Sequence, residues 1–190
     1  MTTEILPAEQ AAIYARAHPT AFSLFTKRDY QDADVHWKIG KALRMAAEGA
    51  DCDQEDCGCG VVDRLIIEAP PRHGKSELAS VRFPAWYLGR NPAHRIIGTA
   101  YGSDLAIGFG RQARNVMELP EFKAIFPGVE LAKDTAAAKE WNISGTGGGY
   151  IAAGVGGPIT GRGAHVLLIE DPVKNRQEAT SELTREQLWD

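Results

Sequence analysis

The 190-residue chain has only three cysteines, no long apolar run and no excess of positive charge. No stretch approaches the length of a membrane span, and the N-terminus lacks the charge pattern of a signal peptide, so we expect a cytosolic protein with no membrane contact. A formal net charge of −4 argues against a broad nucleic-acid-binding surface. Any contact with DNA would have to be local.

The cysteines Cys52, Cys57 and Cys59 all lie in the acidic, turn-rich residues 49–60. Three thiols could hold a metal, but zinc normally takes four ligands, and the spacing Cys-x₄-Cys-x-Cys is not a standard zinc pattern. The alternative is a reduced surface loop, which is the default in a cytosolic protein. We expect neither a metal nor a disulfide here.

The remaining composition is that of a globular protein. Hydrophobic residues make up 44% of the chain and charged residues 24%, which is enough apolar material for a core in about one domain.

The most informative stretch is residues 64–77, which read RLIIEAPPRHGKSE. An apolar strand over 64–68, a tight loop and a helix opening at Gly-Lys-Ser form the context of a phosphate-binding P-loop. Lys75 would reach the β- and γ-phosphates of ATP, and the Ser76 hydroxyl would bind Mg²⁺. Ala69 stands where the usual pattern has its first glycine, and prolines have no N–H, so the cradle must come from the amides of residues 72–76.

A second motif is the apolar strand predicted over residues 165–169, which ends in Glu170 and Asp171. Carboxylates at the end of such a strand form the Walker B arrangement. Glu170 would hold Mg²⁺ through water beside Ser76, and Asp171 would polarise the attacking water. The alternative reading is two solvated acids at a strand end.

The rest of the chain alternates strands and helices. Helices are predicted over 7–17 and 34–48, after the loop to about residue 88 with a kink or end at Pro84, from about 103, within 119–129, and over 180–190. Strands are predicted over 95–100, and over 140–144 and 150–153 as a hairpin. We therefore predict an α/β fold of the P-loop NTPase type. Its mostly parallel sheet would be covered by helices on both faces and incomplete at the C-terminus.

Two further regions have open readings. Tyr30, Gln31 and Trp37, ahead of the first strand, are candidates to hold the adenine of ATP, or they pack the 34–48 helix against the sheet. Residues 154–163 hold five glycines and form either a mobile loop that senses nucleotide or DNA, or a flexible connector.

Five stretches together resemble the phage terminase large subunit, the ATPase that drives DNA into a procapsid. They are APPRHGKSE at 69–77, FPAWYLGRNP at 83–92, FPGV at 126–129, GGPITGRG at 156–163 and LLIEDP at 167–172. Their order fits the front of that family's ATPase domain from about Tyr30 onward. The departure is Glu170, where the family usually has Asp at the metal position.

The resemblance implies a function and a setting. Residues 1–60 would be a helical segment with the cysteine loop, and residues 61–190 the front of the ATPase core, with the family's nuclease domain absent. The cofactors would be ATP and Mg²⁺. The partners would be double-stranded DNA, the portal protein, the terminase small subunit and further copies in a ring, in the host bacterial cytoplasm at the procapsid portal.

The family also carries functional arginines at places that Arg72 and Arg162 occupy. Arg162, between two glycines, would act in trans on ATP held by the neighbouring subunit, or would only pair with a carboxylate such as Glu170. The predicted catalytic residues are Asp171, Lys75, Arg72 and Arg162. The predicted cofactor-binding residues are Arg72, His73, Gly74, Lys75, Ser76, Glu77 and Gln31, and the predicted metal ligands are Ser76 and Glu170.

Two other functions stay open. One is a P-loop NTPase of the helicase type that acts on nucleic acid. The other is a nucleotide-binding module without turnover.

Overall fold

The computed structural model describes residues 8–48, 62–182 and 186. The helices are α1 (Ala8–Ala17), α2 (Pro19–Thr26), α3 (Asp34–Glu48), the π-helix η1 (Glu77–Arg82), α4 (Phe83–Arg90), α5 (Ser103–Glu118), α6 (Pro120–Ile125) and α7 (Arg176–Thr180). The strands are β1 (Arg95–Ala100), β2 (Leu131–Ala136), β3 (Glu140–Ile143), β4 (Gly149–Gly154) and β5 (Val166–Glu170). No helix in the described part is long and apolar enough to cross a membrane.

The five strands form one mixed sheet in the order β2-β3-β4-β1-β5. β1 is parallel to β4 and to β5, whereas β3 is antiparallel to β2 and to β4. The expectation of a mostly parallel sheet is therefore wrong. The reason is local: short turns can only join antiparallel neighbours, and a parallel pair needs a longer crossover. The hairpin predicted from strands 140–144 and 150–153, joined across residues 145–149, is confirmed as β3 and β4.

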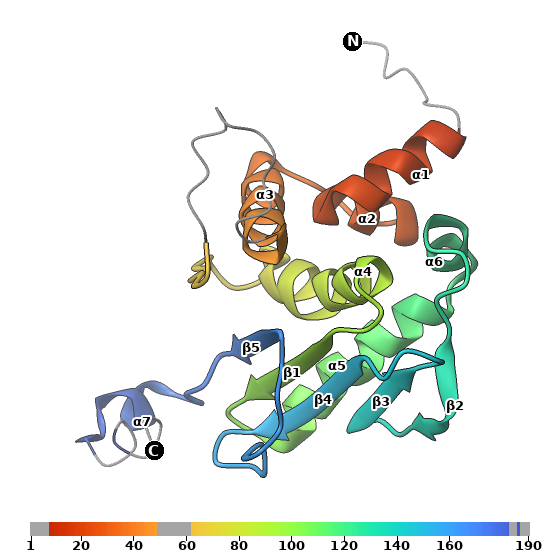
Figure 1. The fold of residues 1–190 in the computed structure, drawn as a ribbon. Coiled ribbons are helices and arrows are strands. Elements are labelled where there is room, and N and C mark those ends of the chain that lie inside the picture. The colour runs from red at the N-terminus through yellow and green to blue at the C-terminus, as the bar shows by residue number, and fades with distance from the viewer. Residues whose placement is uncertain (1–7, 49–61, 183–185, 187–190) are drawn as a thin grey trace.

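α5 covers one face of the sheet and lies behind it in Figure 1, in contact with β1 and β4. Tyr150 stacks on Trp141 at 5.4 Å between ring centroids, and the Trp141 indole donates to the Gly110 carbonyl of α5 at 3.1 Å. The connection from β4 to β5, residues 155–165, passes over β1 on the opposite face (Figure 1). Helices were expected on both faces of the sheet. On the face opposite α5, this glycine-rich connection lies over β1 in place of a helix.

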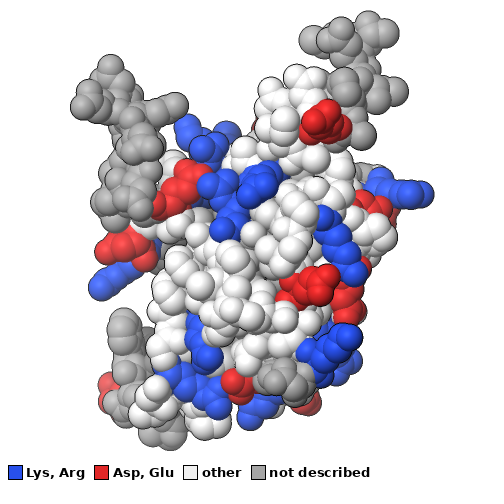
Figure 2. Space-filling model, turned by 45° about the vertical axis from the view of Figure 1, so that its right-hand side comes forward, with Lys and Arg blue, Asp and Glu red and all other residues white. Residues whose placement is uncertain are grey.

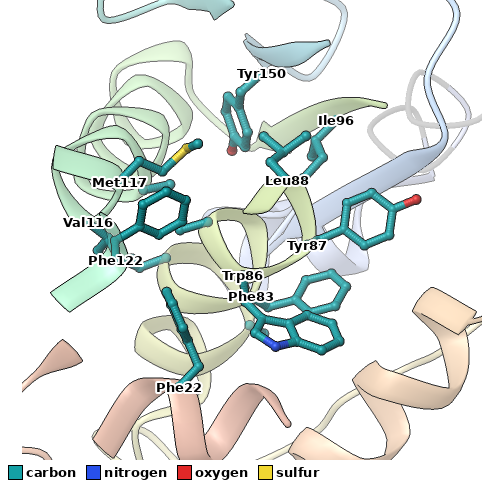
Figure 3. Packing of buried hydrophobic residues seen from close by; sticks show 14 of the residues in the cluster. Phe22, Phe83, Trp86, Tyr87, Leu88, Ile96, Val116, Met117, Phe122 and Tyr150 are labelled. Carbon is teal, nitrogen blue, oxygen red and sulfur yellow. The ribbon is translucent and has the colours of Figure 1, made fainter. Parts of the chain in front are cut away.

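One apolar core joins the N-terminal helices to the helices and sheet that follow. Trp86 of α4 is fully buried, and its indole donates to the Arg16 carbonyl of α1 at 3.1 Å. Phe22 of α2 lies on the same side of α4 as Trp86 (Figure 3). Leu88 of α4 lies beside Ile96 of β1. The first three helices are therefore packed onto the helix that leads away from the 69–76 loop.

The strand predicted over residues 64–68 is not formed. This segment is extended without a strand partner, and the Ile66 side chain is 86% exposed. β5 is the last strand of the sheet on its side, and Leu167 and Ile169 of β5 are exposed as well. A strand needs hydrogen bonds from a neighbour, so apolar character alone did not place residues 64–68 in the sheet.

Pro84 neither ends nor interrupts the helix after the loop. The chain passes from η1 directly into α4, with Pro84 in the first turn of α4. The Phe83 amide donates to the Leu78 carbonyl, five residues back. Proline lacks an N–H and clashes with the carbonyl four residues earlier, and the wider π turn ahead of it relieves that conflict.

Other predicted elements differ in detail. The helices predicted over 7–17, 34–48 and 119–129 correspond to α1, α3 and α6, and the one from about 103 to α5. α2 and β2 were not predicted. α7, which covers Arg176–Thr180, was not predicted either. The helix predicted over 180–190 lies mostly outside the described residues, as does the cysteine segment.

We expect the stability of this fold to decrease as the pH falls below 6.5. Burial lowers the pKa of His18 and of His94 from 6.5. The Nδ1 of His18 accepts a hydrogen bond from the Thr20 amide at 3.2 Å, and the Nδ1 of His94 is hydrogen-bonded to the Tyr87 hydroxyl at 2.8 Å. Because the unfolded chain takes up these protons first, acid favours unfolding. Urea unfolding between about pH 8 and about pH 5 measures this loss.

The matched control is the variant His18→Asn combined with His94→Asn. His18 is the N-cap residue of α2, and asparagine is a good N-cap residue. Because asparagine does not titrate at either position, the curve of stability against pH should flatten in this range. An unchanged pH dependence in the variant would show that other groups cause it.

Candidate functional site

The 69–76 loop turns sharply between the extended segment and the helix. Arg72 and Gly74 have φ angles of 65° and 73°, the left-handed region that glycine adopts without strain. Gly74 also lies against His36 of α3, since a Cβ at Gly74 would be 2.9 Å from the His36 Nε2. Because the first amides of a helix have no partner within it, the amides at the start of the following helix are the donors that would bind an anion at this loop.

Glu170 at the end of β5 is the centre of the polar contacts at this loop. It is buried, with 8% of its surface exposed. Its Oε1 accepts a hydrogen bond from the Ser76 hydroxyl, and its Oε2 accepts one from the Ser80 hydroxyl at 2.5 Å. Lys75 Nζ lies 3.5 Å from Oε1. Two hydroxyls and an ammonium thus compensate the burial of this carboxylate.

Asp171 faces outward next to Glu170. Its side chain is 63% exposed, and Oδ1 accepts a hydrogen bond from Lys75 Nζ at 3.1 Å. The Asp171 carbonyl accepts from the Tyr101 amide at 3.3 Å, just after β1. The φ angle of Asp171 is 39°, uncommon for a residue other than glycine. This backbone turn sends the two neighbouring carboxylates in different directions.

Lys75 is the shared partner of both carboxylates. Partial burial by itself lowers the pKa of Lys75. The hydrogen bond to Asp171 and the negative charges of Glu170 and Asp171 raise this pKa by more than burial lowers it, so the net shift is upward. Lys75 therefore stays an ammonium ion, which is the form that binds phosphate oxygens.

The other predicted cofactor-binding residues lie at the edge of this cluster or beyond it. Arg72, His73 and Gln31 are exposed, and the His73 Nδ1 donates to the Pro71 carbonyl at 2.9 Å. Glu77 pairs with Arg82 of its own helix η1 at 2.8 Å and with Lys27, just after α2, at 3.5 Å. The structure brings together Lys75, Ser76, Glu170 and Asp171.

The adenine candidates before α3 and in its first turn lie at the surface or are partly buried. Trp37 is 40% exposed, and its indole donates to Asp32 Oδ2 at 2.6 Å. Tyr30 is half-buried with its ring 5.6 Å from the His36 ring. Burial, with the charges of Glu77 and Asp32, raises the pKa of Tyr30 to about 12, so its phenol stays a hydrogen-bond donor.

Arg162 is not in the cluster. Its Nη1 donates to Glu140 Oε2 at 2.7 Å, from the crossover to β3. Of the two readings of Arg162, the structure shows the ion pair with a carboxylate, and the carboxylate is Glu140 and not Glu170. A role for Arg162 on a neighbouring subunit stays a prediction.

Two residues at the site were not predicted. Ser80 contacts Glu170 and stands four residues after Ser76, a spacing that places both hydroxyls on one side of a helix. His36 contacts the loop through the His73 carbonyl. The spacing could have revealed Ser80, whereas no pattern near His36 points to a loop 37 residues later.

No metal cluster is found among the described residues, and the face shown in Figure 2 is not uniformly basic. The described residues contain no group of three His, Cys, Asp or Glu side chains that could hold a metal by themselves. On the face shown in Figure 2, basic and acidic groups are interspersed, in line with the net charge of −4. The oxygen donors of Ser76 and Glu170 nevertheless fit a hard cation such as Mg²⁺, which binds few protein ligands and retains waters.

Comparisons with known proteins give one family. Residues 66–190 match the family described as "Terminase large subunit, T4likevirus-type, N-terminal". No match was found among curated proteins or among solved structures. The matched region contains the 69–76 loop, Glu170 and Asp171.

Proposed function

Because the chain belongs to the N-terminal family of T4-like terminase large subunits, with a role in phage DNA packaging, we propose that it binds Mg²⁺-ATP through a P-loop and hydrolyses it to drive viral DNA into a procapsid. The observation that carries this proposal is the meeting of Lys75 and Ser76 with Glu170 and Asp171 at the end of β5. The pair Lys75 and Ser76 precedes the pair Glu170 and Asp171 by 94 or more positions in the chain.

The phosphates would bind at the 69–76 loop. The loop amides and Lys75 would hold the phosphate oxygens, and the carboxylates that now pair with Lys75 would then share it with the γ-phosphate. Ser76 and Glu170 would hold Mg²⁺, which when bound neutralises charge on the phosphate oxygens. Asp171, which is exposed and separate from Glu170, would polarise the attacking water.

The base and the motor contacts complete the proposal. Tyr30, Gln31 and Trp37 precede or open α3, which packs on η1, and this supports a base site beside the loop. The motor would act on double-stranded DNA as a ring, with the portal protein and the terminase small subunit, in the host bacterial cytoplasm. Arg162, and Arg72 within the loop, would supply positive charge to the transition state.

A nucleotide-binding module without turnover is the second candidate. Residues 64–68 lie outside the sheet, and Ile66 is 86% exposed. A loop whose leading segment lacks a strand partner is less firmly held, and transition-state stabilisation requires a pre-organised site. This observation favours binding without hydrolysis for the 190-residue chain.

The test compares binding with turnover on the same protein. Calorimetric titration with ATP should show saturable binding that strengthens when Mg²⁺ is present, and phosphate release reports hydrolysis. Binding with turnover supports the motor, and binding without turnover supports the module. Absence of ATP binding with and without Mg²⁺ overturns both.

A further inference from the structure

We infer that His36 of α3 is a positioning residue that connects the base side of the nucleotide site to its phosphate loop. The ring contacts both regions, at the Ala33 amide and at the His73 carbonyl. The inference rests on the proposed function for the identity of the ligand. It goes beyond that function because the affinity of the loop for phosphate would then depend on α3, a helix that does not itself contact the phosphates.

The hydrogen bonds of His36 define which nitrogen carries the proton. The Ala33 amide donates to His36 Nδ1 at 3.1 Å. A backbone N–H can only donate, so Nδ1 is unprotonated, and the proton of the neutral ring is on Nε2. His36 Nε2 therefore donates to the His73 carbonyl at 2.8 Å. Both ring nitrogens have a defined and different partner.

Burial and a hydrogen bond from α2 hold His36 in place. His36 is 8% exposed, and its own carbonyl accepts a hydrogen bond from the Thr20 hydroxyl of α2 at 2.8 Å. A continuous path thus runs from Thr20 through His36 to His73, one residue from the left-handed Gly74. The imidazole also fills the space beside Gly74, where a Cβ would be 2.9 Å from Nε2.

The Ala33 side of the ring leads to the base candidates. Residues 27–33 form the connection between α2 and α3, and they include Tyr30 and Gln31. The Tyr30 ring lies 5.6 Å from the His36 ring. A change in this segment when a base binds is transmitted to the loop through the imidazole, because one rigid ring makes both contacts.

The test uses two amide substitutions that each replace one nitrogen of the ring. In His36→Gln the amide nitrogen reaches the place of Nε2 and can still donate to the His73 carbonyl. In His36→Asn the shorter side chain can accept from the Ala33 amide but does not reach His73. The ligands are ATP and inorganic tripolyphosphate, with and without Mg²⁺, measured by calorimetry.

We expect His36→Asn to bind tripolyphosphate and ATP about tenfold more weakly than the parent, since a buried hydrogen bond is lost and the loop is released. His36→Gln should stay within about twofold of the parent. Leu43→Ala is the control: Leu43 is a buried residue of α3, and its loss destabilises the helix packing without touching the loop. It should lower the unfolding temperature and leave tripolyphosphate affinity unchanged.

Equal affinities for His36→Asn and the parent, or equal losses in the Asn and Gln variants, would overturn the inference. Hydrogen exchange of residues 72–76 without ligand gives a second readout. Exchange should be faster in His36→Asn than in His36→Gln, and equal rates would likewise contradict the role of His36. If the parent bound neither ligand, the proposed function would fail while the exchange experiment still decided the inference.

Discussion

Replacing Lys75 by alanine is expected to weaken ATP binding about a hundredfold, because charge-assisted hydrogen bonds to phosphate contribute more than neutral ones. Lys75 is the only basic side chain in contact with both Glu170 and Asp171 in the described part of the chain. Its ammonium lies 3.5 Å from Glu170 Oε1 and 3.1 Å from Asp171 Oδ1. The measurement is calorimetric titration with ATP and Mg²⁺.

The fold should survive this change. Glu170 keeps its hydrogen bonds from Ser76 and Ser80 in the variant, so its buried carboxylate is not left unpaired. Lys123→Ala on the exposed side of α6 removes one positive charge far from the loop and should bind ATP as the parent does. An unchanged affinity in Lys75→Ala, with the parent binding ATP, would exclude a phosphate site at the 69–76 loop.

The second large effect is expected at Asp171. In a complete terminase large subunit, Asp171→Asn should lower ATP turnover by about 10²–10⁴-fold, the range for the loss of a general base. ATP binding should change little, because Asp171 is exposed and the amide keeps an oxygen near Lys75. Phosphate release at saturating ATP measures turnover, and calorimetry on the same protein measures binding.

Glu170→Gln is the companion variant and should behave differently. Glu170 is buried with Ser76 and Ser80, so loss of its charge should raise the Mg²⁺ concentration needed for ATP binding. Asp104→Asn in the first turn of α5 is the charge-matched control and should leave both quantities unchanged. Parental turnover in Asp171→Asn would show that the roles assigned to the two carboxylates are wrong.

The sequence alone determined the elements whose signals are local. The apolar run of β1, the helical pattern of α5 and the hairpin of β3 and β4 were all predicted from residues close together in the chain. Turn glycines support the hairpin: Gly145 and Gly147 have φ angles of 73° and 74°, which other residues rarely adopt. Lys75, Ser76, Glu170 and Asp171 were also predicted as candidate site residues, because each belongs to a short motif with a fixed spacing, and the structure brings them together.

Only the tertiary structure decided the features that depend on distant partners. Residues 64–68 have the composition of a strand, yet a strand forms only where it pairs with another strand through hydrogen bonds. β5 is the last strand on its side of the sheet, and residues 64–68 do not pair with it. Arg162 pairs with Glu140 and not with Glu170, since the crossover between β4 and β5 brings its side chain to the first residue of β3. His36 reaches the loop because α3 packs on η1. A hydrogen bond across 37 residues has no local pattern, since its partner is chosen by packing.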